Sequence, residues 1–120
     1  MSQLNPIQIT VSDKMILATP QCEQMDEVHA QDMQNEVTAA ALQTTTLPVV
    51  LDMSRVTFVP SLSLGVLVTL LKTCKQHNQR FLLVGLQPPI RDVMTACRLD
   101  RLFEIYDTLD DVRTRLGIRG

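Results

Sequence analysis

Residues 49–72 have the sequence VVLDMSRVTFVPSLSLGVLVTLLK. The stretch opens with a short apolar run, which is typical of a strand covered on both faces, and we expect a strand over 47–53. The later apolar residues alternate as in a strand, so their pattern alone does not decide between strand and helix. Pro60 and Ser61 supply an extended residue and a capping hydroxyl, and the segment is longer than a usual strand. We therefore predict a helix over 62–77.

The segments on either side of this stretch alternate between strands and helices. We expect strands at 7–11, 15–18, 81–85 and 102–106, and helices over 26–42, 88–99 and 108–116. Strands that alternate with helices imply right-handed crossovers and parallel strand pairs. The predicted fold is α/β, with a mixed, mainly parallel sheet of about five strands, an antiparallel N-terminal hairpin and about four flanking helices.

The size and charge of the chain limit the kinds of protein that it can be. The chain has 120 residues, which is the size of one domain, and we expect a single domain over 1–120. Its 11 basic and 13 acidic residues give a net charge of -2, and aromatic residues make up only 3%. This composition offers neither the positive charge nor the stacking surfaces that bind nucleic acids, so we expect no nucleic-acid partner.

The sequence contains no signal of export, membrane insertion or metal binding. Residues 1–6 lack a basic-then-apolar leader, and no apolar run approaches the roughly 20 residues that span a bilayer. The three cysteines, at positions 22, 74 and 97, are odd in number and widely spaced, and the chain has only two histidines. We expect a cytoplasmic protein with no disulfide framework, no metal site and no membrane insertion.

The residues that could carry catalysis are scattered. His29 and His77 lie far apart without a nucleophile motif near either, and no glycine-rich phosphate loop is present. Cys74 and Cys97 lie at apolar positions of predicted helices, where we expect small buried side chains and not activated thiols. We predict no enzyme activity, no catalytic residues and no cofactor.

Ser61 allows two interpretations. A hydroxyl in the first turn of a helix lies beside unpaired backbone N–H groups, where a phosphate is electrostatically favoured. The same hydroxyl can be a plain N-cap that contributes about 1 kcal/mol to helix stability, and position alone favours this cap. The helix that follows is apolar around more than one stripe, so it is either deeply buried or leaves one apolar face for a partner.

Residues 51–65 resemble the signature of STAS domains, the anti-sigma factor antagonist family, which is D-x-S-x-V-x-F-x-D-S-x-G-L-G after an apolar strand. Residues 84–93 and 99–107 are similar to later segments of the family, and the likeness covers about residues 7–116. Asp26 falls where the family has an Asp that faces the phosphorylation site.

This resemblance implies a cytoplasmic regulatory module that acts by binding. In the family, the unphosphorylated form docks onto a GHKL-type serine kinase that is also an anti-sigma factor, and phosphorylation of a serine breaks the complex. Carried over to this chain, the resemblance implies Ser61 as the phosphorylation site and Asp26 as its neighbour. The partner-binding residues that it implies are Pro60, Leu62, Ser63, Leu64 and Val66.

A second class of function stays open. Pro60 replaces the usual acidic residue of the signature, and Leu62 and Ser63 replace the following small residue and glycine. Some family members with altered loops are constitutive interaction modules, such as stressosome-like scaffolds or the cytoplasmic STAS subunit of a lipid-transport ABC complex. In that alternative Ser61 is only a cap. The apolar helix face also leaves a homodimer open.

Overall fold

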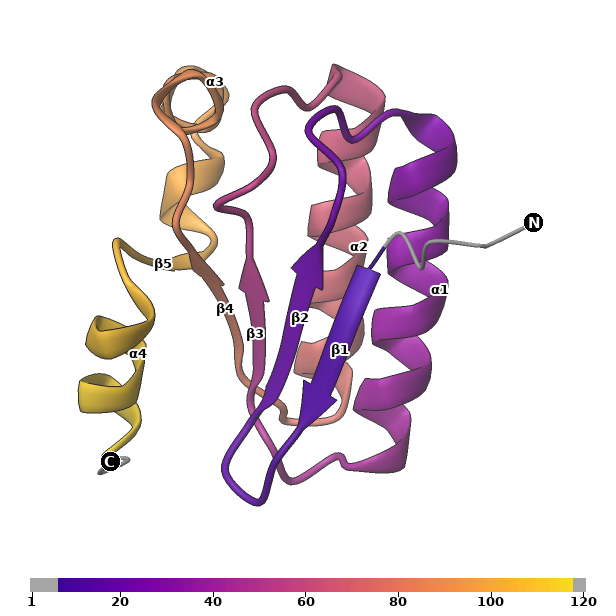
Figure 1. Cartoon of the computed structure of the whole chain (residues 1–120), viewed down its shortest axis with the longest axis vertical. Coiled ribbons are helices and arrows are strands. Elements are labelled where there is room, and N and C mark those ends of the chain that lie inside the picture. Colours follow the sequence, from indigo (N-terminus) through magenta and orange to yellow (C-terminus); the bar gives the residue numbers. More distant parts are fainter. Residues whose placement is uncertain (1–6, 118–120) are drawn as a thin grey trace.

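A five-stranded sheet in sequential strand order forms the centre of the computed structural model, which describes residues 7–117 (Figure 1). Residues 1–6, in which we expected no export signal, lie outside the described residues. The strands are β1 (Ile7–Val11), β2 (Ile16–Pro20), β3 (Val49–Asp52), β4 (Phe81–Val84) and β5 (Glu104–Tyr106). β1 is antiparallel to β2, and the three other pairs are parallel. The predicted mixed sheet with an N-terminal hairpin is confirmed.

Helices cover both faces of the sheet. They are α1 (Glu27–Gln43), α2 (Ser61–Gln76), α3 (Pro88–Ala96) and α4 (Leu109–Leu116), with a short 3-10 turn at Leu99–Arg101. α1 and α2 lie side by side on one face, and α4 lies across the opposite face near β4 (Figure 1). Within residues 7–117, no helix is both long and apolar enough to cross a bilayer.

Two apolar clusters follow from the alternation of side chains along the strands. Val49 and Leu51 of β3 point toward α1 and α2, whereas Val50 belongs to the cluster beneath α4. The larger cluster includes Met33 of α1 and Leu67 of α2, which are both almost fully buried. Because β3 is covered on both faces, its apolar run is continuous instead of alternating, as the sequence indicated.

The boundaries of several elements differ from the predictions. β2 runs to Pro20 instead of ending at 18, because its pairing with β1 continues to that residue. α3 ends at Ala96 because Arg98 has the left-handed backbone angle φ 61°, which a continuing helix does not allow. The 3-10 turn that follows delays the last strand to Glu104. Cys97 is exposed at the end of α3, so the prediction that it is buried is wrong.

Candidate functional site

Two loops run side by side where the parallel strands end. The β2–α1 loop and the β3–α2 loop are joined by backbone hydrogen bonds from Met25 N to the Phe58 carbonyl (2.9 Å) and from Thr57 N to the Glu23 carbonyl (2.7 Å). The Arg55 guanidinium also donates to Oε1 of Gln21 at 3.0 Å. As a result, α1 and α2 begin at the same end of the molecule (Figure 1).

α2 begins without a side-chain cap. Pro60 occupies the N-cap position in an extended conformation (φ -62°, ψ 158°), and its carbonyl accepts from Ser63 N at 2.9 Å and Leu64 N at 3.1 Å. Ser61 is therefore the first helical residue, and its exposed side chain makes no capping hydrogen bond. The prediction that the Ser61 hydroxyl caps this helix is wrong, because an N-cap residue must itself be non-helical and Pro60 takes that place.

Asp26 has the role at α1 that we expected of Ser61 at α2. Its carboxylate accepts from His29 N at 2.9 Å, and the ring Nδ1 of His29 lies 2.8 Å from the same oxygen. The backbone hydrogen bond from His29 is the main reason why the pKa of the Asp26 carboxyl is lowered. The paired loops bring Asp26 and Ser61 to one end of the molecule, but no hydrogen bond within residues 7–117 joins the two side chains.

The predicted partner-binding residues divide into surface and interior. Leu62 is 73% exposed, and Pro60 and Val66 are half-buried. Ser63 and Leu64 are only 1% and 5% exposed, so these two of the predicted contact residues lie mainly in the interior of the domain. The side chain that follows Leu62 turns inward because successive helical residues are about 100° apart around the axis.

The Ser63 hydroxyl is buried and finds no hydrogen-bond partner among residues 7–117. A buried hydroxyl that lacks a partner costs free energy, because it has lost its hydrogen bonds to water. The STAS signature has glycine at this position, which carries no polar group to satisfy. The serine at this position therefore adds a polar group to the interior of the domain.

Sequence reasoning missed an apolar pocket beside the start of α2. Phe58 in the β3–α2 loop is 56% exposed and borders a cavity of about 230 Å³ between this loop and α3. The cavity is lined by Thr57, Phe58, Val59, Leu64, Pro89, Ile90 and Val93. The alternating apolar residues of the loop did not indicate this cavity. Phe58 is exposed because hydrogen bonds with the β2–α1 loop determine the course of its own loop.

Gly65 lies on the exposed side of α2, in open space. A side-chain carbon added there would meet no atom within 4 Å, and the residue has no positive φ. Glycine inside a helix costs about 0.5–1 kcal/mol relative to alanine. Since neither the backbone conformation nor packing within residues 7–117 requires glycine here, its absent side chain leaves room for another molecule to approach the helix backbone closely.

The described residues provide neither a metal-ligand cluster nor an activated thiol at Cys74. Within residues 7–117, no three His, Cys, Asp or Glu residues are placed to hold a metal ion. Burial raises the pKa of the Cys74 thiol to about 11, which keeps it protonated and unreactive at neutral pH. The arrangement at the start of α2 instead offers apolar contact area beside an exposed hydroxyl.

Residues 7–112 match the family model of the STAS domain. The chain belongs to the STAS domain family. STAS anti-sigma factor antagonists are regulatory proteins and not enzymes. A Thermotoga maritima protein that is named as an anti-sigma factor antagonist is 36% identical over 59 residues, which are 49% of this chain and 52% of that protein. The STAS chain thus matches about half the length of this curated relative.

Solved structures share the fold across nearly the whole chain. An anti-sigma factor antagonist (STAS) domain protein from Planctomyces limnophilus has a TM-score of 0.79 at 20% identity, covering 92% of this chain and 97% of its own. The anti-sigma factor antagonist SpoIIAA in its unphosphorylated form has a TM-score of 0.75 at 15% identity, covering 95% and 99%. The phosphorylated form of SpoIIAA, from Bacillus, has a TM-score of 0.67 at 13% identity, covering 90% and 97%.

Proposed function

We propose that this single-domain STAS chain is a cytoplasmic anti-sigma factor antagonist. It binds a GHKL-type serine kinase that is also an anti-sigma factor, and phosphorylation of Ser61 ends the binding. The observation that carries the proposal is the start of α2, which is exposed, apolar and without a side-chain cap. The docking surface consists of Pro60, Leu62 and Val66, extended by Gly65 and Phe58.

Docking at this surface removes apolar area from water. Burying a leucine as exposed as Leu62 contributes roughly 1.5–3 kcal/mol when it enters an apolar pocket. Gly65 lies one turn further along α2 and lets a partner pack against the helix backbone. Phe58 and its neighbouring cavity provide a second apolar anchor from the β3–α2 loop. Aromatic side chains such as that of Phe58 are enriched in protein interfaces.

Phosphorylation would change this surface through charge. A phosphoserine adds about -1.5 to -2 charges and stabilises a helix N-terminus, where the N–H groups of the first residues lack intrahelical acceptors. The first turn of α2 has no acidic residue, so the phosphate would meet no repulsion from within that turn. A docked partner would have to desolvate the phosphate, and Asp26 adds a like charge at the same end of the molecule.

The relatives support a switch of this kind. SpoIIAA, whose fold this chain shares, is described in both unphosphorylated and phosphorylated forms. Sequence identities of 15% and 13% support a shared fold and nothing more. The proposed modification of Ser61 therefore rests on the exposure of this residue and on its position in the STAS signature.

The test uses the kinase of the source organism. We expect the intact mass to rise by one phosphate after incubation with kinase and ATP, and no rise for Ser61→Ala. Unmodified chain and Ser61→Ala should bind the kinase equally, whereas Leu62→Ala should bind at least about tenfold more weakly, as loss of 1.4 kcal/mol predicts. Leu42→Ala is the matched control, since Leu42 is an exposed leucine near the end of α1. Equal binding of the kinase by the two leucine variants would contradict the proposal that Leu62 belongs to the docking surface.

A second candidate is a constitutive interaction module, either a stressosome-like scaffold or the cytoplasmic STAS subunit of a lipid-transport ABC complex. Pro60 favours it, because the STAS signature has an acidic residue directly before the serine and this chain does not. In that case the complex would form and depend on Leu62, but no phosphate would be gained. The intact-mass measurement therefore distinguishes the two candidates, while the leucine variants test the surface that they share.

A further inference from the structure

The first turn of α2 lacks the features that complete the first turns of the other three helices described. α1 and α4 are capped by the side chains of Asp26 and Thr108. α3 has no side-chain cap, but Pro88 and Pro89 occupy its first two positions, so two of its unpaired N–H groups are absent. α2 has neither feature, since its N-cap is Pro60 and no proline follows it in the helix.

Two backbone hydrogen bonds join this turn to the loop before it. The Pro60 carbonyl accepts both, from Ser63 N at 2.9 Å and from Leu64 N at 3.1 Å. The first two helical residues contribute little to the core, because Ser61 is exposed and Leu62 is 73% exposed. These two residues can therefore leave the helix without opening the apolar core.

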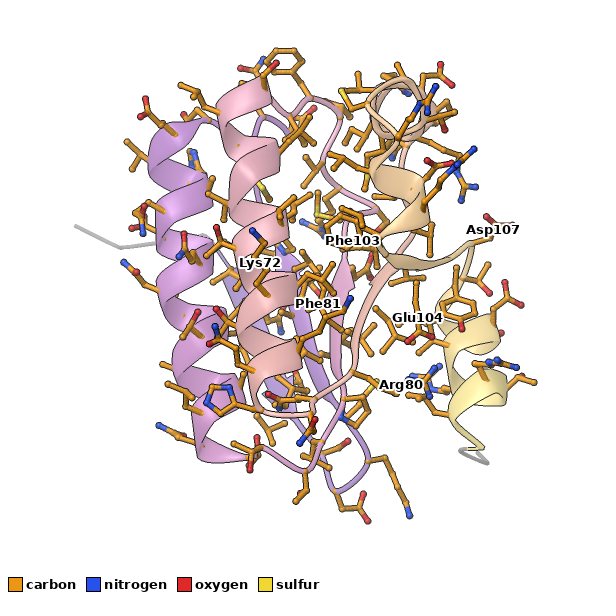
Figure 2. All side chains as sticks on the ribbon, turned by 180° about the vertical axis from the view of Figure 1, so that it is seen from behind. Lys72, Arg80, Phe81, Phe103, Glu104 and Asp107 are labelled. Carbon is orange, nitrogen blue, oxygen red and sulfur yellow. The ribbon has the colours of Figure 1, made fainter. Side chains whose placement is uncertain are left out.

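The first turn also lies on a weak part of the helix. Lys72 marks the outward side of α2 in Figure 2. Ser61 and Gly65 precede Lys72 by close to three and two helical turns, so they lie on the same outward side. Glycine is a poor helix former, and Gly65 has no atom of the domain near the place of its missing side chain. Neither propensity nor packing at Gly65 therefore supports the turn before it.

Ser63 offers the chain a second place to begin the helix. Its hydroxyl is buried and finds no hydrogen-bond partner among residues 7–117. Serine is a preferred N-cap residue, in which the side-chain oxygen accepts from the N–H two or three positions later. If the helix began after Ser63 instead of after Pro60, this oxygen would accept from Gly65 N or Val66 N. The hydroxyl that lacks a partner would then have one.

We propose that the first turn of α2 opens reversibly, with Ser63 in place of Pro60 as the N-cap, and that the open form presents Ser61 to the kinase in an extended segment. Opening breaks both hydrogen bonds to the Pro60 carbonyl and the helical bonds that Ser61 and Leu62 accept, so the open form is the minor one. The link to phosphorylation rests on the proposed function, whereas the opening itself does not.

An extended Ser61 is a better acceptor for phosphoryl transfer than a helical one. The attacking oxygen must lie in line with the γ-phosphate, which requires the kinase to position the residues around it. In the closed form, Ser63 and Leu64 are packed inward, so a kinase can approach Ser61 from one side of the helix only. When only a fraction of the molecules is competent, the apparent affinity falls by that fraction. The rate of phosphorylation should therefore follow the population of the open form.

Native-state hydrogen exchange of the whole chain, measured by ¹H–¹⁵N NMR, tests the opening without a kinase. We expect the Leu64 amide to exchange at least about tenfold faster than the Leu70 amide, after correction for intrinsic rates. Ser63→Ala removes both the unpaired hydroxyl and the alternative cap, so it should slow the Leu64 amide at least about tenfold relative to Leu70. Ser61→Ala is the matched control, and it should slow this amide by less than about threefold, which is the effect of helix propensity alone.

Pro60→Asp tests the same opening by a second route. Its carboxylate would cap the closed form by accepting from Ser63 N, so the Leu64 amide should exchange about fivefold more slowly than in the unmodified chain. The opening is overturned if Ser63→Ala protects the Leu64 amide no more than Ser61→Ala does, or if Pro60→Asp leaves it unchanged.

The kinase assay then tests the link to phosphorylation. We expect Ser63→Ala to be phosphorylated with a kcat/KM at least about tenfold lower than that of the unmodified chain. Equal kcat/KM in a variant that slows exchange would overturn the link. If the unmodified chain gains no phosphate, the proposed function is contradicted instead, and hydrogen exchange still decides whether the turn opens.

Discussion

Helices α1 and α2 lie side by side on one face of the sheet and begin at the same end, but their first turns differ. α1 begins with the carboxylate of Asp26 as its cap and has the acidic Glu27 in its first turn. α2 begins at Pro60 without a side-chain cap, has no acidic residue in its first turn and exposes Leu62. The start of α1 is capped by a side chain of the domain itself. The start of α2 has no side-chain cap, so its backbone N–H groups and its exposed apolar side chain are available to another molecule.

On α2 itself, the residues that stabilise the fold and the residues that are proposed to bind a partner lie on different sides of the helix. The inward side of α2 contributes to the core, and its outward side at the first two turns contributes little to folding. Substitutions on the two sides should therefore affect different measurements. The following predictions test this separation, beginning with the largest expected effect.

Leu67→Ala should lower the free energy of unfolding by about 2–5 kcal/mol, because it opens a cavity between α2 and the sheet. Leu67 is 1% exposed. Urea denaturation gives the value, and Leu62→Ala on the outward side should change it by less than about 0.5 kcal/mol. Similar losses for the two variants would mean that α2 does not have one buried and one free side.

Asp26→Ala should lower the free energy of unfolding, because it removes the side-chain cap of α1. Ser61→Ala, at the corresponding end of α2, should change it by less than about 0.5 kcal/mol, since no capping hydrogen bond is lost. Thermal or urea denaturation at pH 7 checks both. A cost for Ser61→Ala as large as that for Asp26→Ala would show that the two helix starts are alike.

The capping carboxylate of Asp26 also predicts that the free energy of unfolding depends on pH. The pKa of the Asp26 carboxyl is lower in the folded chain, so its ionised form stabilises the fold at pH values above its ordinary pKa of 3.8. This contribution is lost as the pH falls through the lowered pKa. The stability difference between the unmodified chain and Asp26→Asn should therefore shrink on acidification below about pH 4, whereas a constant difference would exclude the charge as its cause.

Gly65→Ala should raise the free energy of unfolding by about 0.5–1 kcal/mol, because alanine favours the helix and meets no atom of the domain. In the same variant, binding to the kinase should weaken, because the added methyl group occupies the space for close approach. Denaturation and a binding titration measure the two effects. A stabilised variant with unchanged binding would remove Gly65 from the docking surface.

Glu104→Gln should lower the free energy of unfolding at pH 7 by less than about 1 kcal/mol, because its ion pair with Arg80 is partly exposed. The hydrogen bond from Arg80 is the main cause of the lowered pKa of Glu104, so the stabilisation is present above the ordinary pKa of 4.5 and is lost as the pH falls through the lowered value. Denaturation at pH 7 and pH 3 should show a smaller difference at the lower pH. The ion pair belongs to the end opposite Ser61, so kinase binding should stay unchanged.

Local signals in the sequence were sufficient for the order of the elements. Thr108 is of a residue type that favours the N-cap position, and its hydroxyl accepts from Asp111 N at 3.1 Å at the start of the last helix. Gly117 follows the last residue of this helix, and it has the positive φ of 74° that favours glycine. These features depend on residues only a few positions apart, so the sequence pattern contains the physical information that determines them.

The details of the proposed docking surface could not be predicted in the same way. Phe58 is exposed because its loop pairs with the β2–α1 loop, whose Glu23 is 35 positions away in the sequence. Ser63 is buried because α2 turns that side toward the interior, although its neighbour Leu62 faces outward. The exposure of these side chains depends on contacts between segments that are far apart in the chain. The local patterns of a single sequence do not specify which distant segments make contact.

The sequence by itself determined that the chain alternates strands and helices, that α2 is a helix despite its alternating pattern, and that the STAS signature surrounds Ser61. The tertiary structure decided which residue begins α2, which side of it remains exposed, and that Phe58 borders an apolar cavity between its loop and α3. Hydrophobic periodicity and turn chemistry act over a few residues and are therefore visible in the sequence. Exposure and charge environment arise from packing between segments, so they exist only in the folded chain.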